Sequence, residues 1–234
     1  MIMDYQIIGD DLQVLRVLLE PEEEIQAEPG AMLCMDQTVK MKVKAGGLFQ
    51  GLKRKLTGES FFLSVFRNTS EDLPAMVCFS APYPGKILAV DLAEYGGEII
   101  CQKGAFFCGT PDVQVSLAFT KNIGAGLFGG EGFVLQKIRG EGMAFIHAGG
   151  MIFEEELVDQ QVMRVDTGSL VAFSAGMRFG VETVGGFKKA LFGGEGLFFV
   201  TLTGPGRVFI QSLPFSRLLE EINRGIAERR REKR

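Results

Sequence analysis

The chain has 234 residues, of which 46% are hydrophobic and 23% charged, and its formal net charge is −4. This composition excludes disordered and fibrous proteins, and the negative charge provides no general attraction to nucleic acid or to anionic membranes. The 31 Gly and 20 Phe, with no Trp, favour a protein of many short strands joined by tight turns and packed through aromatic side chains.

The N-terminal segment and the cysteines predict a reduced, cytoplasmic protein. Residues 1–7 contain no basic residue and no apolar run of signal-peptide length, and no segment approaches the roughly 20 apolar residues of a membrane span. The four cysteines show neither metal-ligand spacing nor an accompanying His cluster; they are Cys34, Cys78, Cys101 and Cys108.

Short segments with alternating polarity recur along the chain and indicate half-buried strands. Three of them begin at Val39, Val113 and Met177, at offsets of 74 and then 64 residues. At the same offsets, each is preceded by a shorter apolar segment and a glycine; these are 25–27 with Gly30, 99–101 with Gly104, and 163–165 with Gly168.

Each of these strands is followed by a Gly-rich loop, a Gly-Glu pair and a second apolar strand. The second strands are expected at 61–66, 133–138 and 197–202, and the last two continue into tight turns and strands at 140–146 and 204–210. The first copy differs, because a longer polar loop at 68–74 precedes its strand at 75–79. Such self-similarity is the signature of internal repeats.

We therefore predict a mainly β protein with one β-repeat domain over residues 1–214, in three repeats at about 4–92, 93–157 and 158–214. Three sheets related by a pseudo-threefold axis would form a barrel or prism with few free edges. From residue 215 the period changes to that of a helix, because Leu218, Leu219, Ile222 and Ile226 share one stripe. The sequence predicts a C-terminal amphipathic helix with a basic tail over 215–234, docked on its own β body or a neighbouring subunit, or on a separate partner.

The Gly-rich loops carry paired Leu and Phe residues that predict three equivalent interaction tips. Apolar residues bordered by lysines are typical of interfacial helices, and the first loop follows this pattern. The expected tip residues are Leu48, Phe49, Leu52, Lys53, Lys55 and Leu56, then Leu127 and Phe128, then Phe187, Leu191 and Phe192. The alternative is that Phe49, Phe128 and Phe192 point inward or form a subunit contact.

Each loop ends near a carboxylate that recurs with the repeat, namely Glu59, Glu131 and Glu195. Three carboxylates on a shared axis would suit a hard cation. The simpler interpretation is that each accepts hydrogen bonds from its own loop backbone, and we therefore expect no metal and no cofactor.

The loops also carry a resemblance to a known family. The segment 28–32, the run 47–62 and the repeated Leu-Phe-Gly-Gly-Glu-Gly are similar to the family named after altered inheritance of mitochondria number twenty-four. The resemblance covers roughly residues 4–214. It implies a β-rich fold similar to the trp RNA-binding attenuation protein and, from the mitochondrial member, a link to inner-membrane organisation. It implies no catalytic residue.

Enzymatic and nucleic acid functions find little support in the residues. The one histidine, His147, follows an apolar strand and is expected to be a core or turn residue, and no phosphate-loop or dinucleotide fingerprint occurs. A basic stripe of Lys40, Lys42 and Lys44 is not repeated, since the corresponding residues are Gln114 and Ser116, then Arg178, Gly180 and Glu182.

The sequence therefore predicts a non-enzymatic, oligomeric scaffold or membrane-surface adaptor in the cytoplasm, with a homotrimer as the first expectation. A small-ligand or nucleic acid binding module is the alternative. The exposed apolar area of the loops and the tail helix favours self-association.

Overall fold

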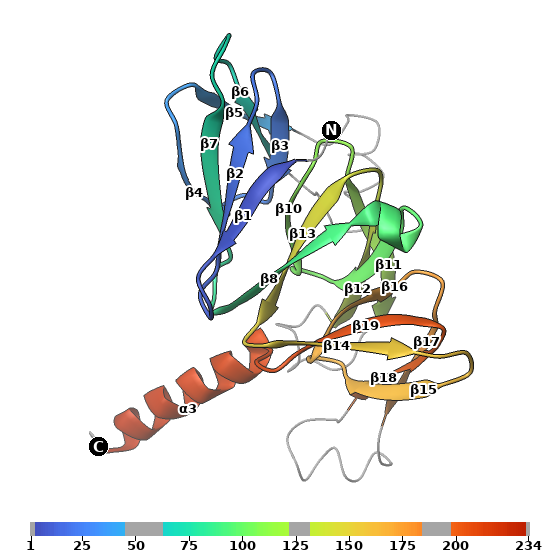
Figure 1. Ribbon diagram of the computed structural model, residues 1–234. Helices are drawn as coiled ribbons and strands as arrows, with labels where there is room; N and C mark the ends of the chain where they lie inside the picture. The colour runs from blue at the N-terminus through green and yellow to red at the C-terminus, as the bar shows by residue number, and fades with distance from the viewer. Residues whose placement is uncertain (1–2, 45–62, 122–131, 184–197, 233–234) are drawn as a thin grey trace. The chain divides into compact units, whose positions relative to one another are not determined.

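The protein consists mainly of β-strands and ends in one long α-helix, as the sequence predicts (Figure 1). The computed structural model describes residues 3–44, 63–121, 132–183 and 198–232. Contacts divide the chain into two compact units. Unit 1 comprises Met1–Glu98, Gly104–Ser116 and Ile138–His147, and unit 2 comprises Ile99–Lys103, Leu117–Lys137 and Ala148–Arg234. The expected single domain with boundaries near 92, 157 and 214 stays a prediction.

Unit 1 contains a four-stranded and a six-stranded sheet. The four-stranded sheet is antiparallel, in the order β1 (Asp4–Ile8), β2 (Val14–Leu19), β7 (Ala75–Ser80), β4 (Met32–Met35). The six-stranded sheet has the order β5 (Val39–Lys44), β6 (Leu63–Asn68), β3 (Glu24–Ala27), β10 (Phe106–Gly109), β13 (Met143–Gly149), β8 (Gly85–Asp91). A short 3₁₀ helix, η1 (Leu92–Tyr95), follows β8.

Unit 2 contains most of a second six-stranded sheet and a three-stranded sheet. The six-stranded order is β11 (Gln114–Lys121), β12 (Phe133–Arg139), β9 (Glu98–Gln102), β16 (Leu170–Ser174), β19 (Gly206–Gln211), β14 (Ile152–Leu157). The three-stranded order is β15 (Val162–Asp166), β18 (Phe198–Thr203), β17 (Arg178–Thr183), and the chain ends with α3 (Phe215–Glu232).

The expected barrel is not formed by any of these four sheets. A barrel closes only when its two end strands hydrogen-bond to each other. In the described ranges every sheet is open, with two different strands at its ends.

The strand orders of the sheets are related by a constant step. Advancing each strand number of the first six-stranded sheet by six gives the order of the second. The run β4-β7-β2 in the four-stranded sheet corresponds in the same way to β10-β13-β8, and the whole three-stranded sheet, β17-β18-β15, corresponds to β11-β12-β9.

Local backbone features recur at the sequence offsets of 74 and 64 residues. A register shift interrupts the pairing of β4, β10 and β16 between Met32 and Cys34, Phe106 and Cys108, and Leu170 and Ala172. A left-handed residue precedes β3, β9 and β15, with φ of 69° at Glu22, 65° at Gly96 and 61° at Gln160. A turn hydrogen bond of 3.0–3.1 Å precedes β5, β11 and β17, in each case donated by the amide of Val39, Val113 or Met177.

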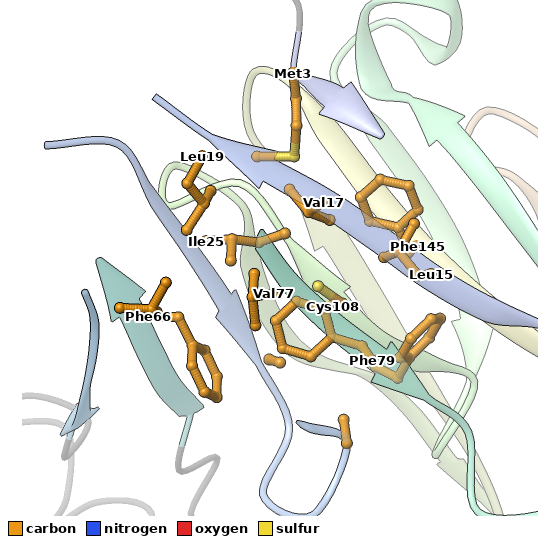
Figure 2. Packing of buried hydrophobic residues seen from close by; sticks show 14 of the residues in the cluster. Met3, Leu15, Val17, Leu19, Ile25, Phe66, Val77, Phe79, Cys108 and Phe145 are labelled. Carbon is orange, nitrogen blue, oxygen red and sulfur yellow. The ribbon is translucent and has the colours of Figure 1, made fainter. Parts of the chain in front are cut away.

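The core of unit 1 lies between strands of both its sheets (Figure 2). Leu15, Val17 and Leu19 alternate with less buried residues along β2 and are fully buried, as the period-two pattern of a one-sided strand requires. Phe66 and Phe79 pack edge to face, with ring centroids 5.2 Å apart. Tyr5 of β1 meets Phe145 of β13 in the same way at 5.0 Å.

Unit 2 has its own core, built from β9, β12, β14, β15, β16, β18 and β19. Its fully buried residues include Phe133, Leu135, Leu170, Phe173 and Val208. The ring of Phe179 on β17 lies against Phe173 at 5.3 Å and so ties the three-stranded sheet to this core.

Candidate interaction surfaces

The predicted loop tips and the three recurrent glutamates lie outside the described residues. They fall in 45–62, 122–131 and 184–197. Their proposed roles as an interaction surface and as loop-supporting carboxylates stay predictions. Among the described residues, no group of three His, Cys, Asp or Glu side chains is placed to hold a metal ion.

Helix α3 presents an apolar stripe to solvent. Phe215, Leu219, Ile222 and Ile226 are 49%, 44%, 51% and 46% exposed. At 3.6 residues per turn these four lie on one face. Arg229 and Arg230 are exposed near the end of the same stripe, where cations also complement the helix dipole. The helix is therefore amphipathic, as predicted, and its apolar face is open to a partner.

The described helices include none that is both long enough and apolar enough to cross a bilayer.

Strand β4 forms a second exposed apolar surface, at the edge of its sheet. All four of its residues are exposed, with Met32 at 37%, Leu33 at 56% and Met35 at 37%. It contains neither a charged residue nor a proline, which are the usual means of protecting a sheet edge. The sequence predicts no role for this strand, because a short apolar segment looks the same at an edge and in the middle of a sheet.

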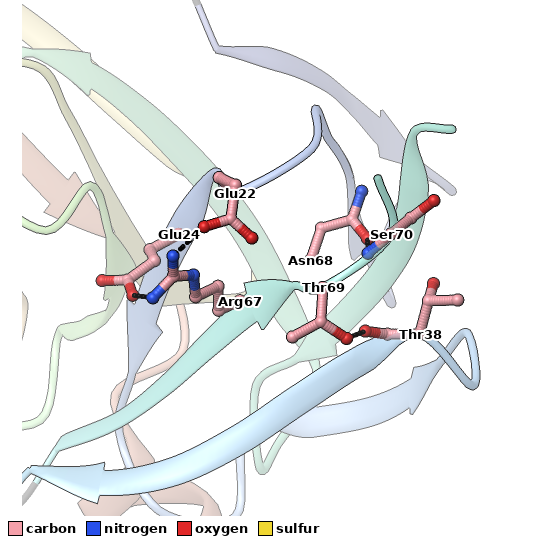
Figure 3. Close-up of polar contacts among 7 residues, drawn as sticks. All are labelled: Glu22, Glu24, Thr38, Arg67, Asn68, Thr69 and Ser70. Carbon is pink, nitrogen blue, oxygen red and sulfur yellow. Dashed lines mark hydrogen bonds and ion pairs between the residues drawn. The ribbon is translucent and has the colours of Figure 1, made fainter. Parts of the chain in front are cut away.

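The third surface is a depression of about 190 Å³ over β3, β5 and β6. It is lined by Glu22, Glu24, Lys40, Lys42, Val65, Arg67 and Thr69. Figure 3 shows Arg67 directed toward the carboxylates of Glu22 and Glu24, the second at 3.9 Å. Lys40 and Lys42 of the basic stripe predicted on β5 therefore lie beside two carboxylates, which reduces their attraction for phosphate.

Asn68 orders the polar loop that follows β6 (Figure 3). Its buried amide nitrogen donates hydrogen bonds to the carbonyl oxygens of Leu19 and Leu73 at 2.9 and 2.8 Å, and its side-chain oxygen accepts from the amide of Ser70 at 3.0 Å. The polar loop at 68–74 is thus a hydrogen-bonded structure around one side chain.

His147 is a core residue of β13, in agreement with the sequence interpretation. Its side chain is 3% exposed, and its ring meets Tyr83 edge to face with centroids 4.5 Å apart. Burial lowers the pKa of this imidazole to about 4, and the backbone of Tyr83 acts weakly in the opposite direction. The imidazole is therefore neutral at physiological pH.

The four cysteines are free, and only Cys34 is exposed. Cys34 on β4 lies directly opposite Cys78 on β7. Burial raises the pKa of Cys78 to about 11, with a further contribution from a hydrogen bond to Cys34, and burial also raises the pKa of Cys108. The buried thiols are therefore poor nucleophiles.

These features define a β protein of several open sheets with an exposed amphipathic helix. The model of the mitochondrial biogenesis AIM24 family matches residues 5–213, and the chain belongs to that family.

The chain is similar to an uncharacterised protein of Streptococcus pyogenes serotype M6, with 26% identity over 209 residues that cover 86% of this chain and 81% of the relative. It is also similar in fold to a crystal structure of a Streptococcus pyogenes protein, with a TM-score of 0.75 and 22% identity over 95% of this chain and 99% of the other. The likeness to the trp RNA-binding attenuation protein stays a prediction.

Proposed function

We propose that the protein is a non-enzymatic, oligomeric scaffold that docks peripherally on an anionic membrane surface from the cytoplasm. The observation that carries the proposal is the exposed apolar stripe of α3 and its flanking arginines. Because Ile222 and Ile226 are about half exposed, burying each of them in the headgroup region contributes roughly 1 kcal/mol. Arginines near an anionic surface add about 1 kcal/mol each.

The scaffold is proposed to contain three structural repeats. The step of six in strand order supports this division, as do the recurrent register shifts and the three left-handed residues before β3, β9 and β15. A further set of equivalent hydrogen bonds adds support: Asn68 to Glu23, Gly140 to Gly97, and Gly204 to Gln161, each from amide to carbonyl at 2.9–3.1 Å.

Flotation of the purified protein with anionic and neutral liposomes tests membrane docking. Wild type is expected to float with anionic liposomes, and I222S/I226S is expected to lose at least about tenfold in bound fraction. The matched control is R217S/E228S, which changes two exposed residues away from the stripe and keeps the net charge. Failure of wild type to float, or equal flotation of I222S/I226S, would contradict the proposal.

The predicted loop tips can be tested in the same assay with Phe49→Ser, Phe128→Ser and Phe192→Ser combined. If this folded variant floats less than wild type, the tips take part in docking. If it floats normally while I222S/I226S does not, docking depends on α3.

A small-ligand or nucleic acid binding module is the second candidate, favoured by the depression that contains Lys40, Lys42 and Arg67. An electrophoretic mobility shift with mixed RNA at low salt tests the nucleic acid form. A shift that K40E/K42E abolishes would support this candidate, and the absence of a shift would exclude RNA.

A further inference from the structure

In the described part of the chain, β4 and β15 are end strands with a neighbour on one side only. The strands equivalent to them in the two six-stranded sheets have neighbours on both sides. By the step of six, β4 corresponds to β10 and β16, and β15 corresponds to β3 and β9. The counterparts pair with one another, β3 with β10 and β9 with β16, both antiparallel. Strand β4 pairs only with β7, and β15 pairs only with β18, so each leaves one edge open.

The residues of β4 are apolar at positions that are buried in both counterparts. Leu33 is 56% exposed, whereas Phe107 and Val171, at the same offsets, are 3% and 1% exposed. Met32, at 37%, likewise corresponds to Phe106 and Leu170, which are fully buried. The sequence of β4 is thus suited to a second neighbouring strand, and among the described residues of its own unit only β7 pairs with it.

Strand β15 shows the same contrast. Arg164 is exposed, whereas its counterparts Gln26 and Ile100 are 1% and 5% exposed. Val162, at the start of this strand, is 58% exposed.

We propose that β15 of one copy pairs antiparallel with β4 of a second copy of this chain. The pairing completes a seven-stranded sheet in the order β17-β18-β15-β4-β7-β2-β1, and its first six strands repeat the order of the two six-stranded sheets already present. Addition of a strand to an open edge satisfies its backbone hydrogen-bonding groups and covers its apolar residues.

The two existing pairings fix the register of the new one. Ala27 lies opposite Cys108, and Cys101 lies opposite Ala172. At the same offsets, Val165 therefore lies opposite Cys34 of the second copy. The next pairs, Gln26 with Gly109 and Ile100 with Phe173, place Arg164 opposite Met35.

The charges at the two edges are complementary in this register. The side-chain amide of Gln26 donates to the carbonyl oxygens of Thr110 and Val113 at 2.9 and 2.6 Å. The corresponding carbonyls on the second copy belong to Asp36 and Val39, so the Arg164 guanidinium takes the position of the amide. It meets both carbonyls beside the Asp36 carboxylate, and a charge-assisted hydrogen bond there is stronger than the neutral one of Gln26.

Because the two edges differ, the contact is head to tail and extends into a ring or a chain of copies. This inference specifies the oligomer within the proposed scaffold and rests on that part of the proposed function. The liposome assay and the cross-linking assay below have separate readouts, so loss of membrane docking leaves the pairing intact, and loss of the pairing leaves docking by α3 intact.

Disulfide cross-linking tests the pairing, with one introduced cysteine on each of the two edges. Variants C34S/M35C and C34S/R164C are mixed, oxidised with diamide and run on a non-reducing gel. A disulfide-linked dimer is expected in the mixture and not in either variant alone, because only the mixture contains both edges. Linkage of C34S/M35C to itself at the same rate, or no linkage in the mixture, would overturn the proposal.

The combined variant C34S/M35C/R164C separates pairing between copies from pairing within one chain. Pairing between copies gives a ladder of linked chains. A cross-linked peptide pair confined to the monomer band would show that the two edges meet within one chain, and would overturn the proposal that a second copy occupies them.

Charge reversal provides an independent test without oxidation. R164E places a carboxylate beside Asp36 of the second copy and also replaces the ion pair of Arg164 with Glu182 at 3.6 Å, so the variant is first checked for unchanged folding. We then expect the dissociation constant of self-association to rise at least about tenfold in sedimentation experiments. The matched control is R178E, on β17 at the other end of the same sheet. Equal self-association of R164E and R178E would contradict the role of Arg164.

Discussion

The side-chain nitrogen of Gln26 lies 2.6 Å from the carbonyl oxygen of Val113, although the two residues are 87 positions apart in the chain. Gln26 is 1% exposed on β3, and the turn that it binds leads into β11. A buried amide in this position stabilises the turn only while its hydrogen bonds are made. Arg164 is at the equivalent position on the open edge of β15. In the proposed pairing it binds the corresponding turn of the second copy.

Gln26→Leu is expected to reduce the free energy of unfolding by about 1–3 kcal/mol, because it removes the side-chain donor from the buried carbonyl oxygen of Val113. Urea unfolding followed by circular dichroism measures the change. Gln6→Leu is the matched control, since Gln6 is exposed on β1, and we expect it to remain within about 0.5 kcal/mol of wild type. Equal losses in the two variants would mean that the buried hydrogen bonds of Gln26 contribute nothing.

Stability is expected to fall with acidification because of His147. The folded state lowers the pKa of this imidazole to about 4, whereas in the unfolded chain it is near its ordinary value of about 6.5. Unfolding therefore takes up a proton between these two pH values, and the free energy of unfolding decreases by up to about 1.4 kcal/mol per pH unit below 6.5.

Urea unfolding at pH 7.0, 6.0 and 5.0 measures this dependence in a range where most carboxylates stay ionised. The chain has a single histidine, so His147→Gln is expected to remove most of the slope. A variant with an unchanged slope would assign the pH dependence to other groups. His147→Leu serves as a second variant if the glutamine destabilises the core.

One thiol is expected to react rapidly with maleimide in the folded protein. Cys34 is exposed, whereas Cys78, Cys101 and Cys108 are buried, and the pKa of Cys78 is raised to about 11. Mass spectrometry should find one label under native conditions and four in denaturant. Cys34→Ala should abolish the rapid reaction; persistent rapid labelling of that variant would contradict the burial of the other three.

The sequence predicted most strands and the C-terminal helix, because alternation and helical periodicity are local properties of the chain. The offsets of 74 and 64 residues recur in the structure, in the hydrogen-bonded turns before β5, β11 and β17. The expected barrel was wrong for these sheets, since closure depends on which end strands meet. For the same reason, nothing local in Met32–Met35 distinguishes an exposed edge strand from the buried strand β10.

The candidate surfaces were predictable to different degrees. The apolar stripe of α3 follows directly from its periodicity. The ion pairs of Arg67 with Glu22 and Glu24 were missed, because they join residues that only the pairing of β3 with β6 brings together. The signal for them is the run of three glutamates at 22–24, but nothing in the sequence alone links this run to Arg67.

Gly140 is expected to tolerate no side chain. Its φ is +143°, and a Cβ atom at this position would lie 2.4 Å from the carbonyl oxygen of Asp112. The clash is with backbone, which cannot rotate away, and the amide of Gly140 is fixed by its hydrogen bond to Gly97 at 3.1 Å. Gly140→Ala should therefore lower the free energy of unfolding by at least about 1–3 kcal/mol.

Gly176→Ala is the control, because no atom lies within 4 Å of its added Cβ and its φ is outside the left-handed range. We expect this variant to be as stable as wild type or slightly more so, since alanine restricts the unfolded chain. Urea midpoints compared between the two variants provide the measurement. A Gly140→Ala protein with the midpoint of Gly176→Ala would show that the turn before β13 can move away from Asp112, and that its hydrogen bond to Gly97 does not hold it in place.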